Sequence, residues 1–270
     1  MRRISLLATT VLLLALVGCG DDEQTANDQT GSGSGSATAS EDTLTGALTV
    51  FAAASLTDVF TSLGEQFEAE HPDVTVVDNF NFAGSSTLAE GIVQAAPADV
   101  FASASPTTMQ TVVDAGLNAE EPTIFVQNTL QIAVPAGNPA GVTGLEDFTN
   151  PELTIALCAE DVPCGTAAIK VFEAAGLTPQ PDTLESDVRA ALTKVELGEV
   201  DAALVYKTDV LVSGDAVEGI DFPESADAVN DYLITTLTDA PNPDAAAAWV
   251  EFVLSEVGLA AFEEAGFQLP

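Results

Sequence analysis

The sequence predicts an α/β protein whose parallel sheets are covered by helices. From Leu48 onward, short apolar stretches that fit buried strands alternate with amphipathic stretches that fit helices. With 270 residues, 47% of them hydrophobic, the chain is long enough for one large domain or for two lobes. Ligands of open α/β sheets bind at the carboxyl ends of the strands, so the joints between strands and helices are the first places to search for a site.

Two series of elements follow one another, and their boundaries have local causes. In the first series, apolar residues recur at helical spacing after Ser55, and Gly116 ends the last helix. In the second series, Gly176 and Gly198 end two helices, because glycine readily adopts the left-handed conformation found after a helix. The first series comprises strand 48–53, helix 56–70, strand 74–80, helix 85–95, strand 98–102, helix 106–115 and strand 124–134. The second comprises strand 153–157, helices 165–175 and 187–197, strand 200–206, helix 207–213, strands 217–222 and 231–237, and helices 243–254 and 256–265.

The N-terminal segment 1–18 is expected to be a signal peptide. Arg2 and Arg3 form a positive region, and the apolar stretch 4–17 is too short to span a bilayer comfortably. The segment leads into Leu-Val-Gly-Cys, which resembles a lipoprotein signal box whose cysteine, Cys19, becomes the lipidated first residue of the mature protein. The alternatives are ordinary secretion and an uncleaved anchor.

A flexible tether is predicted over residues 19–46. It is acidic at its start, contains Gly-Ser-Gly-Ser-Gly-Ser at 31–36 and offers few residues for a core. A lipid anchor followed by such a tether suits an exported protein that is held at the outer face of the cell membrane, or a periplasmic one. The globular part could then move while it stays attached.

The charge is strongly one-sided. There are 42 Asp and Glu residues against 6 Lys and Arg, which gives a formal net charge of −36. Such a surface repels nucleic acid and anionic membranes, so neither is expected as a partner of the globular part.

Two strand-to-helix joints carry hydroxyl groups. Ser55 lies between a strand and a helix, and Asp58 follows three residues later, close to a capping box. Ser85 and Ser86 begin the next helix after Gly84. Unpaired N–H groups and the positive end of a helix dipole make such joints suitable for anions. The plain alternative for both joints is that the serine only caps its own helix.

Three later joints also offer neutral donors. Cys164 opens a helix between Pro163 and Gly165, Val188 lies in the first turn of helix 187–197, and Tyr206 ends strand 200–206. A tyrosine at a strand's carboxyl end can direct its hydroxyl into a cleft. The alternative for Tyr206 is a boundary residue with its hydroxyl in water.

Catalytic and metal-binding chemistry has little support, so no enzyme activity and no cofactor are expected. His71 is the single histidine, and neither a Gly-x-Ser-x-Gly elbow, a Cys/His cluster nor a Gly-rich phosphate loop is found. A carboxylate about 4 Å from an anion costs on the order of 4 kcal/mol at an effective dielectric constant near 20. Asp58, Asp161 and Asp187 are therefore expected to point away from a bound anion.

Several of these motifs together resemble the molybdate-binding lipoproteins and periplasmic proteins of ABC importers. The resemblance covers about residues 47–270, and it departs from the family at Cys164, where other members often carry alanine. A backbone donor tolerates that change if the side chain is directed away. The motifs are Val-Phe-Ala-Ala-Ala-Ser-Leu at 50–56, Phe-Ala-Gly-Ser-Ser-Thr-Leu at 82–88, Ala-Pro-Ala-Asp-Val-Phe at 96–101, Asp-Val-Pro at 161–163 with Gly165, Glu-Ser-Asp-Val-Arg at 185–189 and Val-Tyr at 205–206.

The resemblance implies a two-lobed type II periplasmic binding protein fold, with parallel-rich sheets, flanking helices and a ligand cleft between the lobes. Lobe 1 would comprise 47–126 plus 236–270 and lobe 2 would comprise 127–235, with a hinge at crossings near Val126 and Thr235. The implied function is capture of molybdate or tungstate, by a monomer, and delivery to an ABC transporter permease.

The resemblance also implies the ligand shell. Ser55 and Ser85 would donate hydroxyl and backbone N–H bonds, Cys164 and Val188 would donate backbone N–H bonds, and Tyr206 would donate its hydroxyl. Molybdenum would be bound only as the oxyanion, held by dipoles without a countercharge, and each such hydrogen bond contributes about 1.5–3 kcal/mol.

Other functions remain open from the sequence. A protein of the same fold could bind sulfate or another tetrahedral oxyanion. A secreted serine hydrolase could use Ser55 or Ser85, although the missing base argues against it. A ligand-free adhesion or signalling lipoprotein is a third possibility.

Cys158 and Cys164 are expected to form a disulfide. The intervening residues 159–163 can turn back far enough to bring the two Cα atoms within bonding range. Export to an oxidising compartment favours pairing, and Cys19 is otherwise engaged by lipid. The alternative is a pair of reduced thiols.

Overall fold

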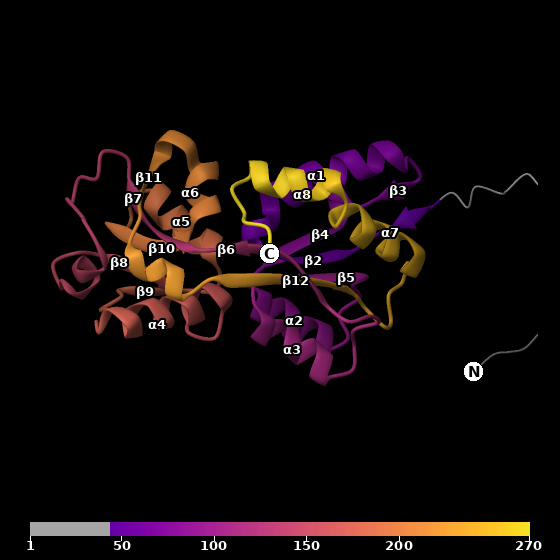
Figure 1. Ribbon diagram of the computed structural model, residues 1–270, viewed down its shortest axis with the longest axis horizontal. Coiled ribbons are helices and arrows are strands. Elements are labelled where there is room, and N and C mark those ends of the chain that lie inside the picture. The colour runs from indigo at the N-terminus through magenta and orange to yellow at the C-terminus, as the bar shows by residue number, and fades with distance from the viewer. Residues whose placement is uncertain (1–43) are drawn as a thin grey trace, which may run out of the picture. The chain divides into compact units, whose positions relative to one another are not determined.

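The computed structural model describes residues 44–270. Within this part of the chain, two five-stranded mixed sheets and one two-stranded sheet are flanked by eight α-helices (Figure 1). The predicted α/β class is confirmed. The expected signal peptide, Cys19 and almost all of the expected tether lie outside the described residues.

The first sheet has the strand order β4-β2-β5-β12-β6. Its β2 strand pairs in parallel with β4 and β5, whereas β12 is antiparallel to both β5 and β6. The strands are β2 (Val50–Ala53), β4 (Phe80–Ala83), β5 (Val100–Ser103), β6 (Thr123–Asn128) and β12 (Asn230–Thr236). A short parallel pair, β1 (Gly46–Ala47) with β3 (Val74–Thr75), lies beside this part of the fold.

The second sheet has the order β11-β7-β10-β8-β9. Strands β10, β8 and β9 are parallel, and β7 is antiparallel to its neighbours β10 and β11. The strands are β7 (Leu130–Pro135), β8 (Ile155–Cys158), β9 (Thr183–Glu185), β10 (Ala202–Tyr206) and β11 (Val217–Ile220).

Helices cover both faces of each sheet (Figure 1). The alternation of side chains along β2 explains the two layers, because Phe51 packs towards α2 and α3 while Val50 and Ala52 join the larger core on the opposite face. The first sheet is flanked by α1 (Thr57–Glu70), α2 (Ser85–Val93), α3 (Pro106–Asp114), α7 (Pro243–Val253) and α8 (Glu256–Glu264). The second is flanked by α4 (Pro163–Ala175), α5 (Val188–Glu196) and α6 (Lys207–Ser213).

Two predicted strands are wrong in a way that matters for the architecture. The apolar stretch 124–134 is not one strand: it divides at Thr129 into β6 and β7, which belong to different sheets. The stretch 74–80 likewise divides into β3, a 3₁₀ turn at Val77–Asn79 and the start of β4. Strand periodicity continues through both breaks, so the sequence pattern alone does not reveal them.

The chain passes between the two sheets twice, and both passages lie next to each other. It leaves the first sheet after Asn128 and returns at Asn230, and these two residues are paired directly across the β6–β12 ladder. Figure 1 shows β12 running from the second sheet into the first. Two adjacent connections of this kind allow two halves of a protein to move relative to each other.

The helices of the described part of the chain were compared with the length and apolar composition that a membrane span requires. Within residues 44–270, no single helix is long and apolar enough to cross a membrane, and the bent pair of α7 and α8 reaches that length and composition only when both helices are taken together. In that pair Trp249 and Phe262 are fully buried against the aromatic core around Phe60.

Candidate functional site

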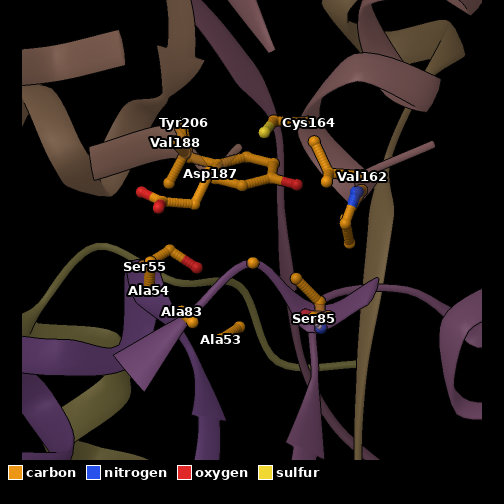
Figure 2. A pocket seen from close by; sticks show the side chains of 13 residues that line it. Ala53, Ala54, Ser55, Ala83, Ser85, Val162, Cys164, Asp187, Val188 and Tyr206 are labelled. Carbon is orange, nitrogen blue, oxygen red and sulfur yellow. Dashed lines mark hydrogen bonds between the residues drawn. The ribbon is translucent and has the colours of Figure 1, made fainter. Parts of the chain in front are cut away.

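All five residues expected to bind a ligand line the same pocket. Ser55, Ser85, Cys164, Val188 and Tyr206 line it together, although they come from five different strand-to-helix joints. Figure 2 shows Ser55 and Ser85 of the first sheet facing Cys164 and Tyr206 of the second across the pocket. The site is therefore built from both sheets at the carboxyl ends of their strands, where ligands of such folds bind.

Ser55 does not cap helix α1, so that part of the interpretation is wrong. A 3₁₀ turn at Ala54–Leu56 delays the start of α1 to Thr57, and Leu56 occupies the cap position without a side-chain bond. The Ser55 hydroxyl instead lies 2.8 Å from the hydroxyl of Tyr232 on β12. Ser55 is thus a buried residue that lines the pocket and whose hydroxyl is bonded to a tyrosine of β12.

Ser85 is the first residue of α2, after Gly84 in the cap position. Its hydroxyl oxygen accepts a hydrogen bond of 3.0 Å from the backbone N–H of Ala104, which follows β5. The capping alternative for Ser85 therefore fails. Because the oxygen already accepts a backbone N–H, the hydroxyl hydrogen is free to point into the pocket.

Cys164 and Val188 occupy the first turns of α4 and α5, where backbone N–H groups have no partner within the helix. Pro163 is the first residue of α4, as the sequence indicated, and Cys164 forms the expected disulfide with Cys158 at the end of β8, with 5.7 Å between the Cα atoms. The bond closes the turn that leads into α4.

The cap of α5 comes from Asp187. Its Oδ1 accepts a hydrogen bond of 2.9 Å from the N–H of Ala190. Asp187 also lines the pocket, but this carboxylate oxygen is engaged by the helix. The cap holds Val188 at the start of the helix, where its N–H forms part of the positive end of the helix dipole.

Tyr206 ends β10 and is buried, so the alternative of a hydroxyl in water is wrong. Its hydroxyl oxygen accepts a hydrogen bond of 2.8 Å from Nδ2 of Asn230. Burial, followed by the neighbouring Tyr232 and Asp209, raises the pKa of Tyr206 well above its ordinary value. The hydroxyl therefore stays protonated and can act as a donor at any physiological pH.

The pocket contains donors but no cation. Among the described residues that line it, none is lysine or arginine. Within residues 44–270 no group of three or more His, Cys, Asp and Glu residues could hold a metal ion. The arrangement suits an anion that only accepts hydrogen bonds.

Arg189 lies beside the pocket and is already neutralised. It pairs with Asp58 of α1 at 2.5 Å and with the buried Asp209 of α6 at 2.9 Å. The first pair joins elements of the two sheets, and so does the bond of 2.6 Å from the Ser86 hydroxyl to the backbone oxygen of Asp161. Neither Asp58 nor Asp161 lines the pocket, as expected, whereas the same expectation is wrong for Asp187, which does line it.

Burial raises the pKa of Asp209 to about 6, although the Arg189 guanidinium and the N–H of Tyr206 both favour the charged carboxylate. The folded protein then binds more protons than the unfolded chain between about pH 4 and pH 6, so the contribution of Asp209 to stability falls as the pH rises through this window. The rise from 3.8 to about 6 corresponds to a loss on the order of 3 kcal/mol.

Asp209→Asn should remove this pH dependence, because the amide keeps the shape and an oxygen for the Tyr206 N–H but does not titrate. Urea unfolding at pH 4 and pH 7 should show the wild type losing on the order of 3 kcal/mol relative to the variant as the pH rises. A difference between the two proteins that stays constant with pH would contradict the assignment.

Sequence reasoning did not find Tyr232, Asn230 and Ala104, which bond to the three hydroxyl-bearing residues of the pocket. Tyr232 and Asn230 lie on the strand that returns from the second sheet. The interior of that strand carries only an ordinary β pattern, so no local signal marked these residues.

Known proteins share this fold and much of this sequence. The family described as bacterial extracellular solute-binding protein matches residues 48–268. The molybdate-binding protein ModA of Mycobacterium tuberculosis is 40% identical over 264 residues, which cover 98% of this chain and 97% of that protein.

Two solved structures extend the comparison. The substrate-binding domain of a putative molybdenum ABC transporter from Clostridium difficile has a TM-score of 0.61 at 27% identity, covering 83% of this chain and 99% of that one. The periplasmic molybdate-binding protein of Azotobacter vinelandii has a TM-score of 0.72 at 17% identity with the same coverage, which shows the shared fold. The chain belongs to the family of bacterial extracellular solute-binding proteins.

Proposed function

We propose that this protein captures molybdate or tungstate outside the cytoplasm and delivers it to the permease of an ABC importer. The observation that carries the proposal is the convergence of Ser55, Ser85, Cys164, Val188 and Tyr206 on one pocket without a cation. Five residues supplying several hydrogen bonds, each contributing about 1.5–3 kcal/mol to a charged ligand, can offset the dehydration of a tetrahedral dianion. A relative named as a molybdate-binding protein and a solved structure named for a molybdenum transporter support the choice of ligand.

The proposed ligand roles follow from the hydrogen bonds. Ser85 and Tyr206 accept from N–H donors, so the hydrogen of each hydroxyl is available to a ligand in the pocket. The same holds for Ser55 if the Tyr232 hydroxyl is the donor in their shared bond. Cys164 and Val188 supply backbone N–H groups from two helix starts.

The lobes are proposed to follow the two sheets. The first lobe comprises residues 44–128 and 230–270, the second comprises 129–229, and the hinge lies at the paired residues Asn128 and Asn230. We place the second crossing at Asn230 in this proposal, earlier than the Thr235 expected from the sequence, because the whole of β12 pairs within the first sheet. Ligand binding would favour the closed arrangement, in which both lobes contribute donors.

Anchoring and assembly are part of the same proposal. An exported chain with lipid on Cys19 and a tether that ends before the folded part would remain near the permease that it serves. The tether is proposed to be shorter than the expected 19–46, because Leu44 packs against the core and Gly46 belongs to β1. The protein is proposed to act as a monomer and without a cofactor, because one chain supplies every group of the site.

A serine hydrolase is the less favoured alternative. The single histidine, His71, packs on the ring of Phe67 with 4.6 Å between centroids. It caps the far end of α1, so it is remote from Ser55, and Ser55 has a tyrosine hydroxyl rather than a base as its partner. Sulfate remains the nearest rival ligand, because it is also a tetrahedral dianion without hydrogens to donate.

Calorimetric titration of the purified protein with molybdate, tungstate, sulfate and phosphate tests the proposal. Molybdate and tungstate should bind tightly and release heat, with sulfate much weaker. Binding of sulfate alone would assign the protein to a different oxyanion, and binding of none would exclude oxyanion capture.

Removing single hydroxyls should weaken molybdate binding without disturbing the fold. Ser55→Ala, Ser85→Ala and Tyr206→Phe should each lose about 1.5–3 kcal/mol of binding free energy, because each removes a hydrogen bond to an anion. Ser62→Ala, on the outer part of α1, is the matched control and should bind as the wild type does. Unchanged affinity in all three pocket variants would contradict the site.

A further inference from the structure

Asn230 occupies a special place in the fold. It is the first residue of β12, where the chain returns from the second sheet to the first. Its side chain is buried, with 6% of the residue exposed, and it does not line the pocket itself. Any influence of Asn230 on a ligand must therefore pass through the residues that it contacts.

Its amide group contacts both sheets at once. Nδ2 donates to the Tyr206 hydroxyl of the second sheet at 2.8 Å and to the backbone oxygen of Ala104, at the end of the first sheet's β5, at 2.9 Å. The Pro163 oxygen lies farther away, at 3.5 Å. One hydrogen of this nitrogen is thus donated to a group of the second sheet, and the other to a group that follows a strand of the first sheet.

The contact with Ala104 leads on to the second pocket hydroxyl. The N–H of Ala104 donates to the Ser85 hydroxyl oxygen at 3.0 Å, while its carbonyl accepts from Asn230. A continuous series of bonds therefore runs from Ser85 through Ala104 and Asn230 to Tyr206. It connects two proposed ligand hydroxyls that lie on opposite sides of the pocket.

The chemistry of an amide nitrogen gives this series a direction. Nδ2 can only donate, so the Tyr206 oxygen must accept, and its own hydrogen must point elsewhere. A tyrosine hydroxyl without this neighbour could turn its hydrogen into the protein and offer the ligand a lone pair. Fixing the hydrogen before the ligand arrives lowers the ordering cost of binding.

We propose that Asn230 is a positioning residue of the binding site, which orients the Tyr206 hydroxyl as a donor towards the ligand and joins it to the Ser85 side of the pocket. This inference rests on the proposed function, because it assumes an oxyanion in the pocket. It adds to the site Asn230, a residue of the connection between the proposed lobes, which acts through Tyr206 without lining the pocket.

A double-mutant cycle tests the proposal. Asn230→Leu keeps the approximate shape and removes both donors, and Asn230→Ala serves as a second variant if leucine prevents folding. Either change should weaken molybdate binding about tenfold in the wild-type background, but no more than about threefold when Tyr206 is already phenylalanine. Titration calorimetry measures all four affinities.

Asn128→Leu provides the matched control. Asn128 is the same residue type, is also buried, and lies directly opposite Asn230 on β6, but its amide donates to Thr208 rather than to Tyr206. Asn128→Leu should change the molybdate affinity by the same factor whether residue 206 is tyrosine or phenylalanine. A merely structural role of Asn230 would give this additive result as well.

The outcomes separate this inference from the proposed function. An equal loss from Asn230→Leu in both backgrounds, or no loss at all, overturns the positioning role while leaving molybdate binding intact. If the wild type binds sulfate and not molybdate, the molybdate proposal fails, and the same cycle run with sulfate still decides the role of Asn230. A wild type that binds none of these anions overturns both.

Discussion

Replacing Gly165 with alanine is expected to lower the unfolding free energy by about 3 kcal/mol and to weaken oxyanion binding about 100-fold. A Cβ atom at this position would lie 1.8 Å from the backbone oxygen of Ala159 and 2.9 Å from that of Cys158. Both are backbone atoms, so no side-chain rotation relieves the overlap, and overpacking of this kind costs typically 1–3 kcal/mol or more. Gly165 follows Cys164 directly, so the strain falls on the backbone of the proposed donor.

The surroundings of Gly165 leave little room for adjustment. The Cys158–Cys164 disulfide closes the turn on one side. The N–H of Ala159 is bonded to the oxygen of Glu185 at 2.8 Å, and the N–H of Val162 to the oxygen of Ala159 at 3.1 Å. Relief must therefore come from a shift of the first turn of α4. A displacement of about 1 Å in a positioned group can change an affinity or rate about 100-fold.

Gly91→Ala is the control for this experiment. Gly91 lies inside α2, and a Cβ atom there would meet nothing closer than 3.8 Å. Alanine is favoured over glycine in a helix by roughly 0.5–1 kcal/mol, so this variant should be slightly more stable and bind normally. Urea unfolding and calorimetric titration measure both effects. A Gly165→Ala protein as stable and as tight-binding as the wild type would show that the turn before α4 is not rigid.

The positions of the five pocket residues were predictable because each lies in a stretch whose boundaries have a local signal, and the family resemblance selected the residue within that stretch. Each of Ser55, Ser85, Cys164, Val188 and Tyr206 marks the end of a strand or the start of a helix. The apolar runs and glycines around them define those boundaries within a few residues. The carboxyl ends of parallel strands then lie at one edge of a sheet, so the topology brings each sheet's contributions together.

The orientation of the hydroxyls was not predictable, because it depends on partners far away in the chain. The local pattern around Ser55 favoured a helix cap, yet its partner is Tyr232, 177 positions later. Tyr206 takes its donor from Asn230, 24 positions later. Such a side chain can form its hydrogen bond with a local group or with a residue far away in the chain. Tertiary packing decides between the two, and no short window of the sequence contains that information.

The division of residues 123–135 between two sheets illustrates the same limit for the fold. Its apolar residues are buried on both sides of Thr129, so the pattern reads as one strand. The change of sheet depends on pairing with β12 on one side and with β10 and β11 on the other. Those pairings involve residues about 70 to 110 positions away, so the change of sheet, and with it the proposed hinge, depends on the topology.

Gly84→Ala is expected to weaken molybdate binding about 100-fold while leaving the stability of the ligand-free protein nearly unchanged. The backbone of Gly84 has φ −57° and ψ 131°, which alanine adopts without strain. A Cβ atom here would lie 2.3 Å from the backbone oxygen of Ser186. Gly84 precedes α2 on the first sheet and Ser186 precedes α5 on the second, so the overlap arises only when the two halves are close together.

An overlap between halves is relieved by opening, which distinguishes Gly84 from Gly165. Ordinary contact requires about 1 Å more separation, and donors on opposite sides of the pocket then cannot all reach one anion. Small-angle scattering should show the wild type contracting when molybdate is added, whereas Gly84→Ala should contract less, and Gly91→Ala on the same helix should behave as the wild type. If Gly84→Ala contracts as much as the wild type and binds within about twofold of it, the close contact between Gly84 and Ser186 is not required for binding. The ligand would then be held by donors whose spacing does not depend on closure.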